Sequence, residues 1–146
     1  MFRGRFEHTM DSKGRVSIPS GFRVELQRRS DRAPILTNAE QCLFLFPFED
    51  WCAFESRVVG FSSFDPDAQD YARMMISGAS ECPIDAQGRI LVPPVLREHA
   101  GLEREATIAG VGEKIEIWDK GRFDANLQKT RARFFEISSA VSKLRA

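Results

Sequence analysis

The stretch Asp11-Ser12-Lys13-Gly14-Arg15-Val16-Ser17-Ile18-Pro19 decides the fold of this chain, because it occurs twice. The second copy is Asp85-Ala86-Gln87-Gly88-Arg89-Ile90-Leu91-Val92-Pro93, at an offset of 74 residues (85 − 11). Each copy continues to an arginine four residues beyond its proline, Arg23 in the first and Arg97 in the second. A repeat of this size in a short chain indicates two copies of one structural unit.

The length and composition fit a small folded protein. The chain has 146 residues, 42% of them hydrophobic, which suits one compact domain or two very small ones. Each unit has about 70 residues, a size at which a lone core is marginal and association often supplies the missing burial. Twelve phenylalanines are many for this length. We expect them in the core or at subunit contacts, because exposed patches of that size cause aggregation.

Neither a membrane segment nor a disulfide framework is expected. No apolar run approaches the roughly 20 residues that span a bilayer, and the first five residues lack the apolar region of a secretory signal. We therefore expect a cytoplasmic protein with no membrane partner. The three cysteines are an odd number, and we expect Cys42, Cys52 and Cys82 to be reduced and partly buried.

The charges are unevenly distributed along a chain whose net charge is zero. Residues 1–32 carry eight basic and four acidic side chains, a balance of +4. Residues 33–70 carry one and seven, a balance of −6, and residues 71–146 carry twelve and ten, a balance of +2. A basic end beside an acidic middle predicts one face that binds anions.

Local patterns predict the elements of the first unit. Residues 5–10 alternate between apolar and polar side chains, as a half-buried strand does. Asp11 can accept backbone N–H groups and Gly14 can adopt positive φ, which is turn chemistry. We therefore predict a hairpin over residues 5–18, followed by a short helix over residues 20–27.

Two more strands complete each unit. They are predicted at residues 34–37 and 42–46 in the first unit and at 106–109 and 114–118 in the second. Each unit thus has the order strand–turn–strand–helix–strand–turn–strand. The helix of the second unit is predicted to begin at Pro94 and to stop at Gly101, both favoured positions for those residues.

Three helices are predicted outside the repeated units. One begins at Pro47 and stops at Gly60 and Ser62-Ser63, and the next is capped by Asp65. A long C-terminal helix is predicted from about Phe123, because an apolar seam with a period of about 3.5 residues runs along it. The seam comprises Phe123, Leu127, Thr130, Phe134, Ile137, Val141 and Leu144, with Thr130 its only polar member. Such a seam needs a partner, either the body of its own subunit or a neighbour. The other faces of this helix carry Lys129, Arg131, Arg133, Lys143 and Arg145.

The sequence offers no catalytic residues, no metal site and no cofactor site. Asp11 and Asp85 could be paired carboxylates, but each has an arginine four residues later that would hold it ionised. The only histidines are His8 and His99, and no spacing of cysteine and histidine suits zinc. We therefore do not expect an enzyme.

Nucleic acid is the better candidate ligand, because a two-stranded ribbon fits the major groove of B-DNA. The tip of the first hairpin carries Lys13 and Arg15, and its base carries Arg3 and Arg5. The second unit replaces three of these with neutral residues, namely Gln87, Ser77 and Ala79. We therefore predict that the DNA-binding residues are Arg3, Arg5, Lys13 and Arg15, with possible secondary contacts from Ser12 and Arg23.

The second hairpin is interpreted as scaffold. Its turn residues Asp85, Gly88 and Arg89 match Asp11, Gly14 and Arg15 and form a structural motif. Arg15 has two possible roles, contact with DNA or an ion pair with Asp11 that fastens the turn. Lys13 beside it favours DNA contact for Arg15.

With both Asp-x-x-Gly-Arg boxes in view, the whole chain resembles the MraZ family of the swapped-hairpin group that includes AbrB, SpoVT and MazE. The opening Met-Phe-Arg-Gly-Arg-Phe-Glu-His, the doubled box and the Ile-Pro and Val-Pro steps carry the resemblance. It implies an α+β fold, in which two tandem swapped-hairpin units of the double-split β-barrel type form a pseudo-dimer. The chain departs from the usual pattern at Gly21, where many relatives have a larger, often basic residue.

The resemblance also implies a division of the chain and a function. The expected parts are a first DNA-binding unit (residues 1–50), a helical connector (51–74), a second unit (75–120) and a C-terminal helix (121–146). The implied function is sequence-specific transcriptional regulation, usually repression, of the protein's own division and cell-wall gene cluster. Ring-shaped homo-oligomers, octamer-like or larger, would bind short repeated promoter boxes in double-stranded DNA at the nucleoid. The alternative is an antitoxin-like interaction module that neutralises a partner through its long helix.

Overall fold

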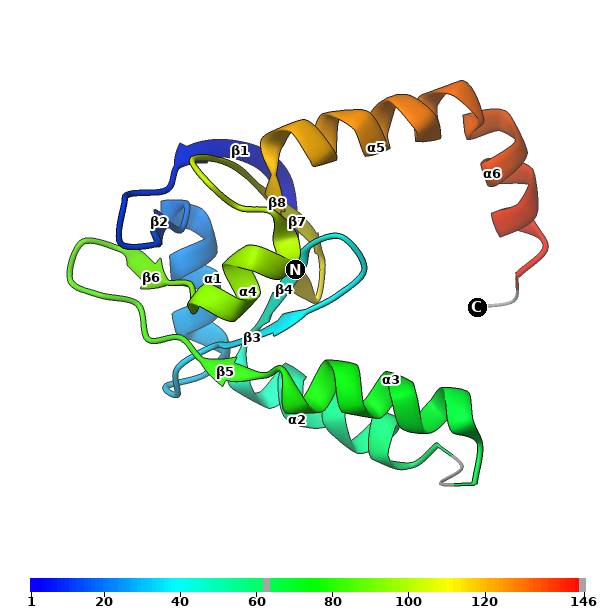
Figure 1. Cartoon of the computed structure of the whole chain (residues 1–146), viewed down its shortest axis with the longest axis horizontal. Coiled ribbons are helices and arrows are strands. Elements are labelled where there is room, and N and C mark those ends of the chain that lie inside the picture. The colour runs from blue at the N-terminus through cyan, green and yellow to red at the C-terminus, as the bar shows by residue number, and fades with distance from the viewer. Residues whose placement is uncertain (62–63, 145–146) are drawn as a thin grey trace.

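A computed structural model describes residues 1–61 and 64–144 (Figure 1). The predicted helix stop at Ser62-Ser63 and the side chain of Arg145 therefore lie outside the described residues. The first unit contains β1 (Phe2–Thr9), β2 (Arg15–Ser17), α1 (Ser20–Arg29), β3 (Ile35–Asn38) and β4 (Leu43–Phe46). Between the units lie α2 (Phe48–Val59) and α3 (Pro66–Ser77). The second unit contains β5 (Ser80–Glu81), β6 (Arg89–Leu91), α4 (Pro94–Ala100), β7 (Glu105–Gly112) and β8 (Lys114–Asp119). The chain ends with α5 (Lys120–Ala132) and α6 (Phe134–Ser142).

The main sheet interleaves the two units. Its six strands have the order β1-β7-β8-β4-β3-β5. One strand of the first unit is followed by two of the second, then two of the first and one of the second. Reading the order from either end gives equivalent strands of the two units, which is the pattern of a pseudo-twofold axis between β8 and β4. This arrangement confirms the predicted α+β fold of two tandem swapped-hairpin units.

A second sheet joins the units through their repeated boxes. The short strands β2 and β6 pair antiparallel, with Val16 opposite Ile90 at the centre. The prediction of a closed hairpin over residues 5–18 is wrong, because β1 pairs along its whole length with β7 and not with β2. β1, before the turn, belongs to the six-stranded sheet, and β2, after the turn, belongs to the two-stranded sheet. Alternation along a strand predicts its two faces but does not identify its neighbour.

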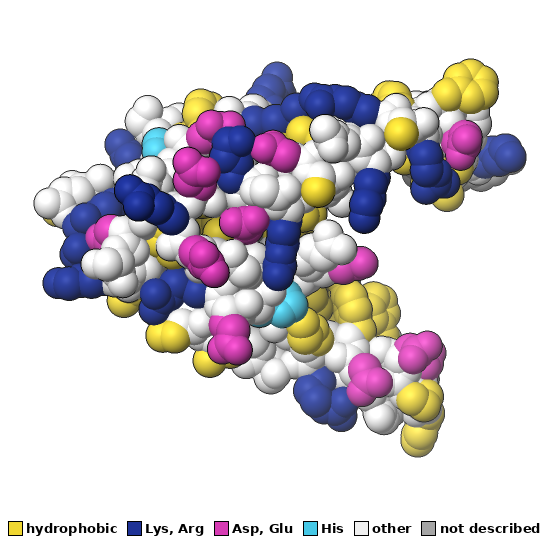
Figure 2. Space-filling model, turned by 45° about the horizontal axis from the view of Figure 1, so that its top comes forward, with side chains coloured by type: hydrophobic (Ala, Val, Ile, Leu, Met, Phe, Trp, Pro, Cys, Tyr) yellow, Lys and Arg dark blue, Asp and Glu magenta, His cyan; other side chains and the backbone are white. Residues whose placement is uncertain are grey.

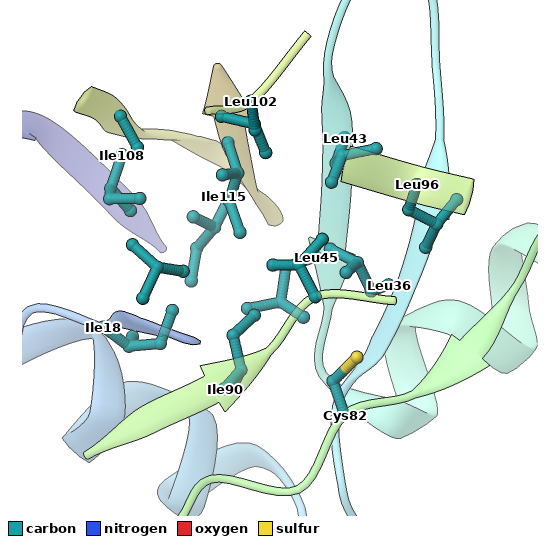
Figure 3. Packing of buried hydrophobic residues seen from close by; sticks show 14 of the residues in the cluster. Ile18, Leu36, Leu43, Leu45, Cys82, Ile90, Leu96, Leu102, Ile108 and Ile115 are labelled. Atoms are coloured by element: carbon teal, nitrogen blue, oxygen red, sulfur yellow. The ribbon is translucent and has the colours of Figure 1, made fainter. Parts of the chain in front are cut away.

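One hydrophobic core serves both units (Figure 3). Ile18 and Leu45 of the first unit and Ile90 and Ile115 of the second are fully buried in it. Deep burial of such side chains stabilises the fold by about 1.5–3 kcal/mol each. Since the two units contribute to the same core, neither unit has a complete interior of its own.

Several predicted local signals act as expected. The Asp65 carboxylate caps α3 by accepting a hydrogen bond from the Asp67 N–H at 2.9 Å, and Pro66 occupies the first helical position. Gly101 ends α4 with φ of 66°, in the left-handed region that glycine adopts without strain. Cys42 and Cys82 are buried, Cys52 is half-buried, and all three are free thiols.

The C-terminal segment is two helices and not the single long helix predicted from the seam. α5 ends at Ala132, and Arg133 leaves helical geometry with φ of −119° before α6 begins. Phe123 and Leu127 pack against Trp118 and the body of the protein. The break follows Thr130, the polar position of the seam, where the helix has left the surface that supports its first turns.

Two helical arms project from the same side of the body, to the right in Figure 1. The acidic arm, as we name it, is the pair α2–α3, and the basic arm is the pair α5–α6. Five of the twelve phenylalanines are more than 40% exposed, namely Phe6, Phe61, Phe64, Phe134 and Phe135. Four of these five lie on the two arms. None of the described helices is long and apolar enough to cross a membrane.

Two glycine-to-alanine substitutions test the pairing of β1 with β7. A Cβ at Gly110 would lie 2.6 Å from the carbonyl carbon of Phe2 and would also meet the backbone nitrogen of Arg3, neither of which can move aside freely. We expect Gly110→Ala to lower the free energy of unfolding by about 1–3 kcal/mol. Gly21 in α1 has open space around it, so Gly21→Ala should raise that free energy, by up to about 1 kcal/mol. Urea unfolding followed by circular dichroism measures both, and equal effects of the two changes would contradict the pairing.

Candidate nucleic-acid interface

The Asp11 carboxylate organises the first turn. Its Oδ1 accepts hydrogen bonds from the backbone N–H groups of Lys13 at 3.0 Å and Arg15 at 2.9 Å. Its Oδ2 accepts from Nε of Arg15 at 2.7 Å. Gly14 has φ of 90°, which lets the chain reverse at this point. The predicted turn chemistry is therefore present, and Arg15 pairs with Asp11 within one chain.

The second turn repeats this geometry. Asp85 Oδ1 accepts from the backbone N–H groups of Gln87 and Arg89, each at 2.9 Å. Its Oδ2 accepts from Nε of Arg89 at 3.1 Å, and Gly88 has φ of 79°. The Asp-x-x-Gly-Arg box is thus a turn motif in both units, as the sequence predicts for Asp85, Gly88 and Arg89.

The two turns lie side by side and hold each other. The N–H of Ile18 donates to the carbonyl of Gly88, and the N–H of Val92 donates to the carbonyl of Gly14, each at 2.9 Å. The Arg89 guanidinium also reaches across to the Asp11 carboxylate at 3.7 Å. Both turns therefore stand at one end of the molecule, on the left in Figure 1.

An arginine from each unit packs against the turn of the other unit. A Cβ at Gly14 would lie 2.7 Å from Cζ of Arg97, and a Cβ at Gly88 would lie 2.6 Å from Cζ of Arg23. These arginines also donate to the carbonyls that precede the two prolines, Arg23 Nη1 to Ile18 at 2.8 Å and Arg97 Nε to Val92 at 3.1 Å. Only glycine leaves room for this packing.

Arg15 and Arg89 differ in how many of their donors are engaged. Arg89 uses Nε on Asp85, Nη2 on Gln87 and Nη1 toward Asp11. Arg15 uses only its backbone N–H and Nε, both on Asp11. Among the described residues, Nη1 and Nη2 of Arg15 have no partner, although one third of the side chain is exposed. Arg15 can therefore bind a further acceptor without giving up the contact that fastens its turn.

The two turns also differ in the charge of their outermost residues. Ser12 and Lys13 are exposed, and the Lys13 ammonium makes no hydrogen bond or ion pair within the described chain. The equivalent positions Ala86 and Gln87 are exposed but neutral. Figure 2 shows Lys and Arg side chains gathered at this end of the molecule.

Arg3 and Arg5 are not brought to the turns. They lie on β1 opposite Val111 and Ala109 of β7. The Arg5 guanidinium stands 5.7 Å from the ring centre of Phe123 at the start of α5. Arg5 lies six positions before Asp11, which corresponds to about 20 Å along an extended chain. The predicted DNA contacts of Arg3 and Arg5 stay predictions.

Arg104 lies beside the first turn and was not among the residues predicted from the sequence. Arg104 and Glu103 line a groove together with Asp11 and Ser12, and the Arg104 carbonyl accepts a 2.5 Å hydrogen bond from the N–H of Met10. Arg104 lies outside the repeated box and more than 90 residues from Asp11, so no local pattern points to it. The role of Arg97 beneath Gly14 was equally hidden, although its place in the repeat was visible.

The carboxylates of the turns are ionised and unsuited to proton transfer. Backbone donation from Arg15, followed by its side-chain hydrogen bond, lowers the pKa of Asp11 from 3.8 to about 2. Backbone donation from Arg89 likewise lowers the pKa of Asp85. Among residues 1–61 and 64–144, no three His, Cys, Asp or Glu side chains are grouped so that they could hold a metal ion. The geometry of the turns offers fixed hydrogen-bond donors to an anion.

Both halves of the chain match one family model. The model is described as "MraZ protein, putative antitoxin-like", and it matches residues 1–74 and 75–144. Among curated relatives, a protein of Solidesulfovibrio magneticus is 41% identical over 92% of this chain and 90% of its own length. One of Thermoanaerobacter pseudethanolicus is 39% identical over 99% of both chains, and one of Syntrophobacter fumaroxidans is 42% identical over 87% and 85%. All three are named transcriptional regulator MraZ.

The lowered pKa of Asp11 predicts how its contribution to stability depends on pH. The folded-state pKa of about 2 lies below the ordinary value of 3.8, so ionised Asp11 stabilises the folded state above about pH 4. We expect Asp11→Asn to unfold at a lower temperature than the wild type at pH 7. The gap should close as the pH falls from about 4 toward 2. Differential scanning calorimetry over this range measures it, with Asp31→Asn as control because Asp31 makes no ion pair among the described residues. A gap that persists at pH 2 would contradict the role of the Asp11 charge.

Proposed function

Because the chain belongs to the MraZ family, we propose that it is a transcriptional regulator that binds DNA through its paired turns. Its targets are short repeated boxes in the promoter of its own division and cell-wall gene cluster, which it represses. The protein works in the cytoplasm at the nucleoid, and it needs no catalytic step and no cofactor.

The unequal engagement of Arg15 and Arg89 supports this proposal most strongly. The two arginines occupy equivalent positions in two turns of the same geometry. The Arg89 side chain contacts three protein acceptors, whereas the Arg15 side chain uses only one of its nitrogens. Arg89, with its donors engaged, holds its turn rigid, and Arg15, with two nitrogens unengaged, offers donors to a ligand. Rigid placement lowers the entropy lost on binding.

Each residue of the first turn suits a particular contact with duplex DNA. The two terminal nitrogens of Arg15 match the O6 and N7 acceptors of guanine in the major groove. Lys13 suits a phosphate oxygen, as a mobile cation at the outermost point. The Ser12 hydroxyl can donate to either. Arg23 contributes as a secondary contact from beneath the Gly88 turn. Arg3 and Arg5 are proposed as phosphate contacts at the margin of the interface.

A ring-shaped homo-oligomer accounts for the affinity that a neutral protein needs. One interface built on an N-terminal segment with a balance of +4 is a weak DNA ligand. Several such interfaces on an octamer-like ring, facing boxes at matching spacing, bind through their effective concentration. The repeated boxes in the promoter and the repeated subunits of the ring then both raise the affinity for DNA.

The alternative is an antitoxin-like interaction module without promoter function. The exposed apolar residues of α6 favour it, because they could hold a protein partner. A promoter gel shift separates the two functions. A salt-sensitive and sequence-dependent shift supports the regulator, and the absence of a shift at low salt supports the interaction module.

Substitution of the first turn should abolish specific DNA binding and leave the fold intact. We expect Lys13→Ala with Arg15→Ala to cost about 1–3 kcal/mol for the lost base contact and to lower the slope of log K against log salt by about 1. Fluorescence anisotropy with a promoter fragment and a scrambled fragment measures both quantities.

The matched control is Gln87→Ala at the equivalent exposed position of the second turn, which should change binding little. Circular dichroism and sedimentation velocity check that each variant keeps its fold and its assembly. Wild-type affinity in the double variant would contradict the proposed interface. Loss of the assembly in that variant would show that Arg15 is structural.

A further inference from the structure

A pocket of about 580 Å³ lies where three separate segments of the chain meet. The segments are the turn between β3 and β4, the end of α4 and one face of α5 (Figure 1). The lining residues are Gln41, His99, Arg122, Ala125, Asn126 and Lys129. Pockets of this volume hold small molecules in many proteins. None of the six residues belongs to the paired turns, so the pocket is separate from the proposed DNA interface.

Four of the lining residues share one face of α5, because they are spaced three, four and seven residues from the first. They are Arg122, Ala125, Asn126 and Lys129. An adjacent stripe of the helix holds it on the body, where the ring of Phe123 meets that of Trp118 with centres 5.6 Å apart. The small side chain of Ala125 leaves the space between its longer neighbours open.

Hydrogen bonds fix the three segments relative to one another. The ring nitrogen Nε2 of His99 lies 2.6 Å from the carbonyl oxygen of Ala39, at the β3–β4 turn. Nη1 of Arg122 donates to the carbonyl oxygen of His99 at 3.2 Å. The Asp119 carboxylate caps α5 by accepting from the Arg122 N–H at 3.0 Å. The walls are therefore preformed, and binding requires little further ordering of the protein.

The lining is positively charged. Arg122 and Lys129 supply two cations, and no carboxylate is among the six lining residues. Within the described ranges, Nε and Nη2 of Arg122 and the Lys129 ammonium have no hydrogen-bond or ion-pair partner. Seven helical positions separate the two residues, about 10 Å along the axis. Cations spaced in this way suit a chain of phosphate groups better than one compact anion.

Two amide side chains add groups that recognise a neutral part of a ligand. Gln41 and Asn126 each carry donors and an acceptor, and neither amide is engaged by another described residue. Gln41 has φ of 67°, the only positive φ among the described residues other than glycine. Residues held in this region are frequent at ligand sites. Glutamine and asparagine amides pair with the polar edges of nucleobases, as they do with N6 and N7 of adenine.

We propose that this pocket binds a nucleoside di- or triphosphate. Arg122 and Lys129 contact the phosphate chain, and the amides of Gln41 and Asn126 contact the base. The two side-chain cations neutralise the phosphates directly, so the ligand binds in the presence of EDTA. The inference goes beyond the proposed regulation of a promoter and does not depend on the DNA-binding role of the turns.

Isothermal titration calorimetry with ATP in a buffer containing EDTA tests the ligand class. We expect saturable binding whose affinity falls in the order ATP, ADP, AMP and adenosine, because each lost phosphate removes contacts with the two cations. Inorganic tripolyphosphate has the same phosphate chain without a base, and it should bind more weakly than ATP. Equal affinities for ATP and tripolyphosphate would overturn the assignment to a nucleotide.

Two substitutions in α5 test the location. We expect Lys129→Gln to weaken ATP binding about threefold or more. Ala125→Glu should abolish measurable binding, because its carboxylate would face the phosphates. The matched control is Arg131→Gln, which removes a cation of the same helix that lies outside the pocket and makes no ion pair among the described residues. It should bind ATP as the wild type does, and circular dichroism checks that all three variants keep their helices.

The turn variant, Lys13→Ala with Arg15→Ala, separates this site from the DNA interface. It should keep wild-type affinity for ATP, since the turns and the pocket share no residue. Loss of ATP binding in the turn variant, with Lys129→Gln and Ala125→Glu unaffected, would place the nucleotide at the turns and overturn the proposal. A wild-type protein that does not bind ATP would overturn it as well. Neither result bears on the regulator function, which the promoter gel shift tests independently.

Discussion

The antiparallel pairing of β2 with β6 is the constraint on which the rest of the structure depends. It is only three residues long, but it places Val16 and Ile90 in a shared core and brings the two repeated turns together. Because β2 pairs with the other unit, β1 is left to pair with β7, and the main sheet must interleave the units. A short pairing thus commits both halves of the chain to one folded body.

The pairing also brings the two copies of one motif together, although their arginines make different contacts. Each turn is braced by an arginine of the opposite unit, so each is held in place by residues that do not belong to it. In the second copy, Arg23 of the first unit packs against Gly88, and Arg89 contacts the carboxylates of Asp85 and Asp11. In the first copy the Lys13 ammonium and the two terminal nitrogens of Arg15 have no partner among the described residues, and these are the donors that we propose for DNA.

Much of the fold was predictable from the sequence, because the repeat and the residues Asp11, Gly14, Asp65 and Gly101 carry local physical meaning. The partners of the strands were not predictable, since alternation shows which side of a strand is buried and leaves its neighbour open. The break after Ala132 was hidden for a similar reason, because a continuous seam does not show where its support ends.

The same limit applied to the candidate site. The contrast between Lys13 and Gln87 was visible from comparing the two copies, and it predicts which turn binds DNA. The engagement of Arg89 with Asp11 and the position of Arg104 required the three-dimensional arrangement, because both join residues more than 70 positions apart.

Site-specific photo-crosslinking tests most directly whether the paired turns form the DNA-facing end. A photoreactive amino acid is placed at position 13, on the first turn, or at the exposed position 71, on α3, and each protein is irradiated with a promoter fragment. The account predicts crosslinks to DNA from position 13 and none from position 71. Crosslinks from position 71 without any from position 13 would contradict it.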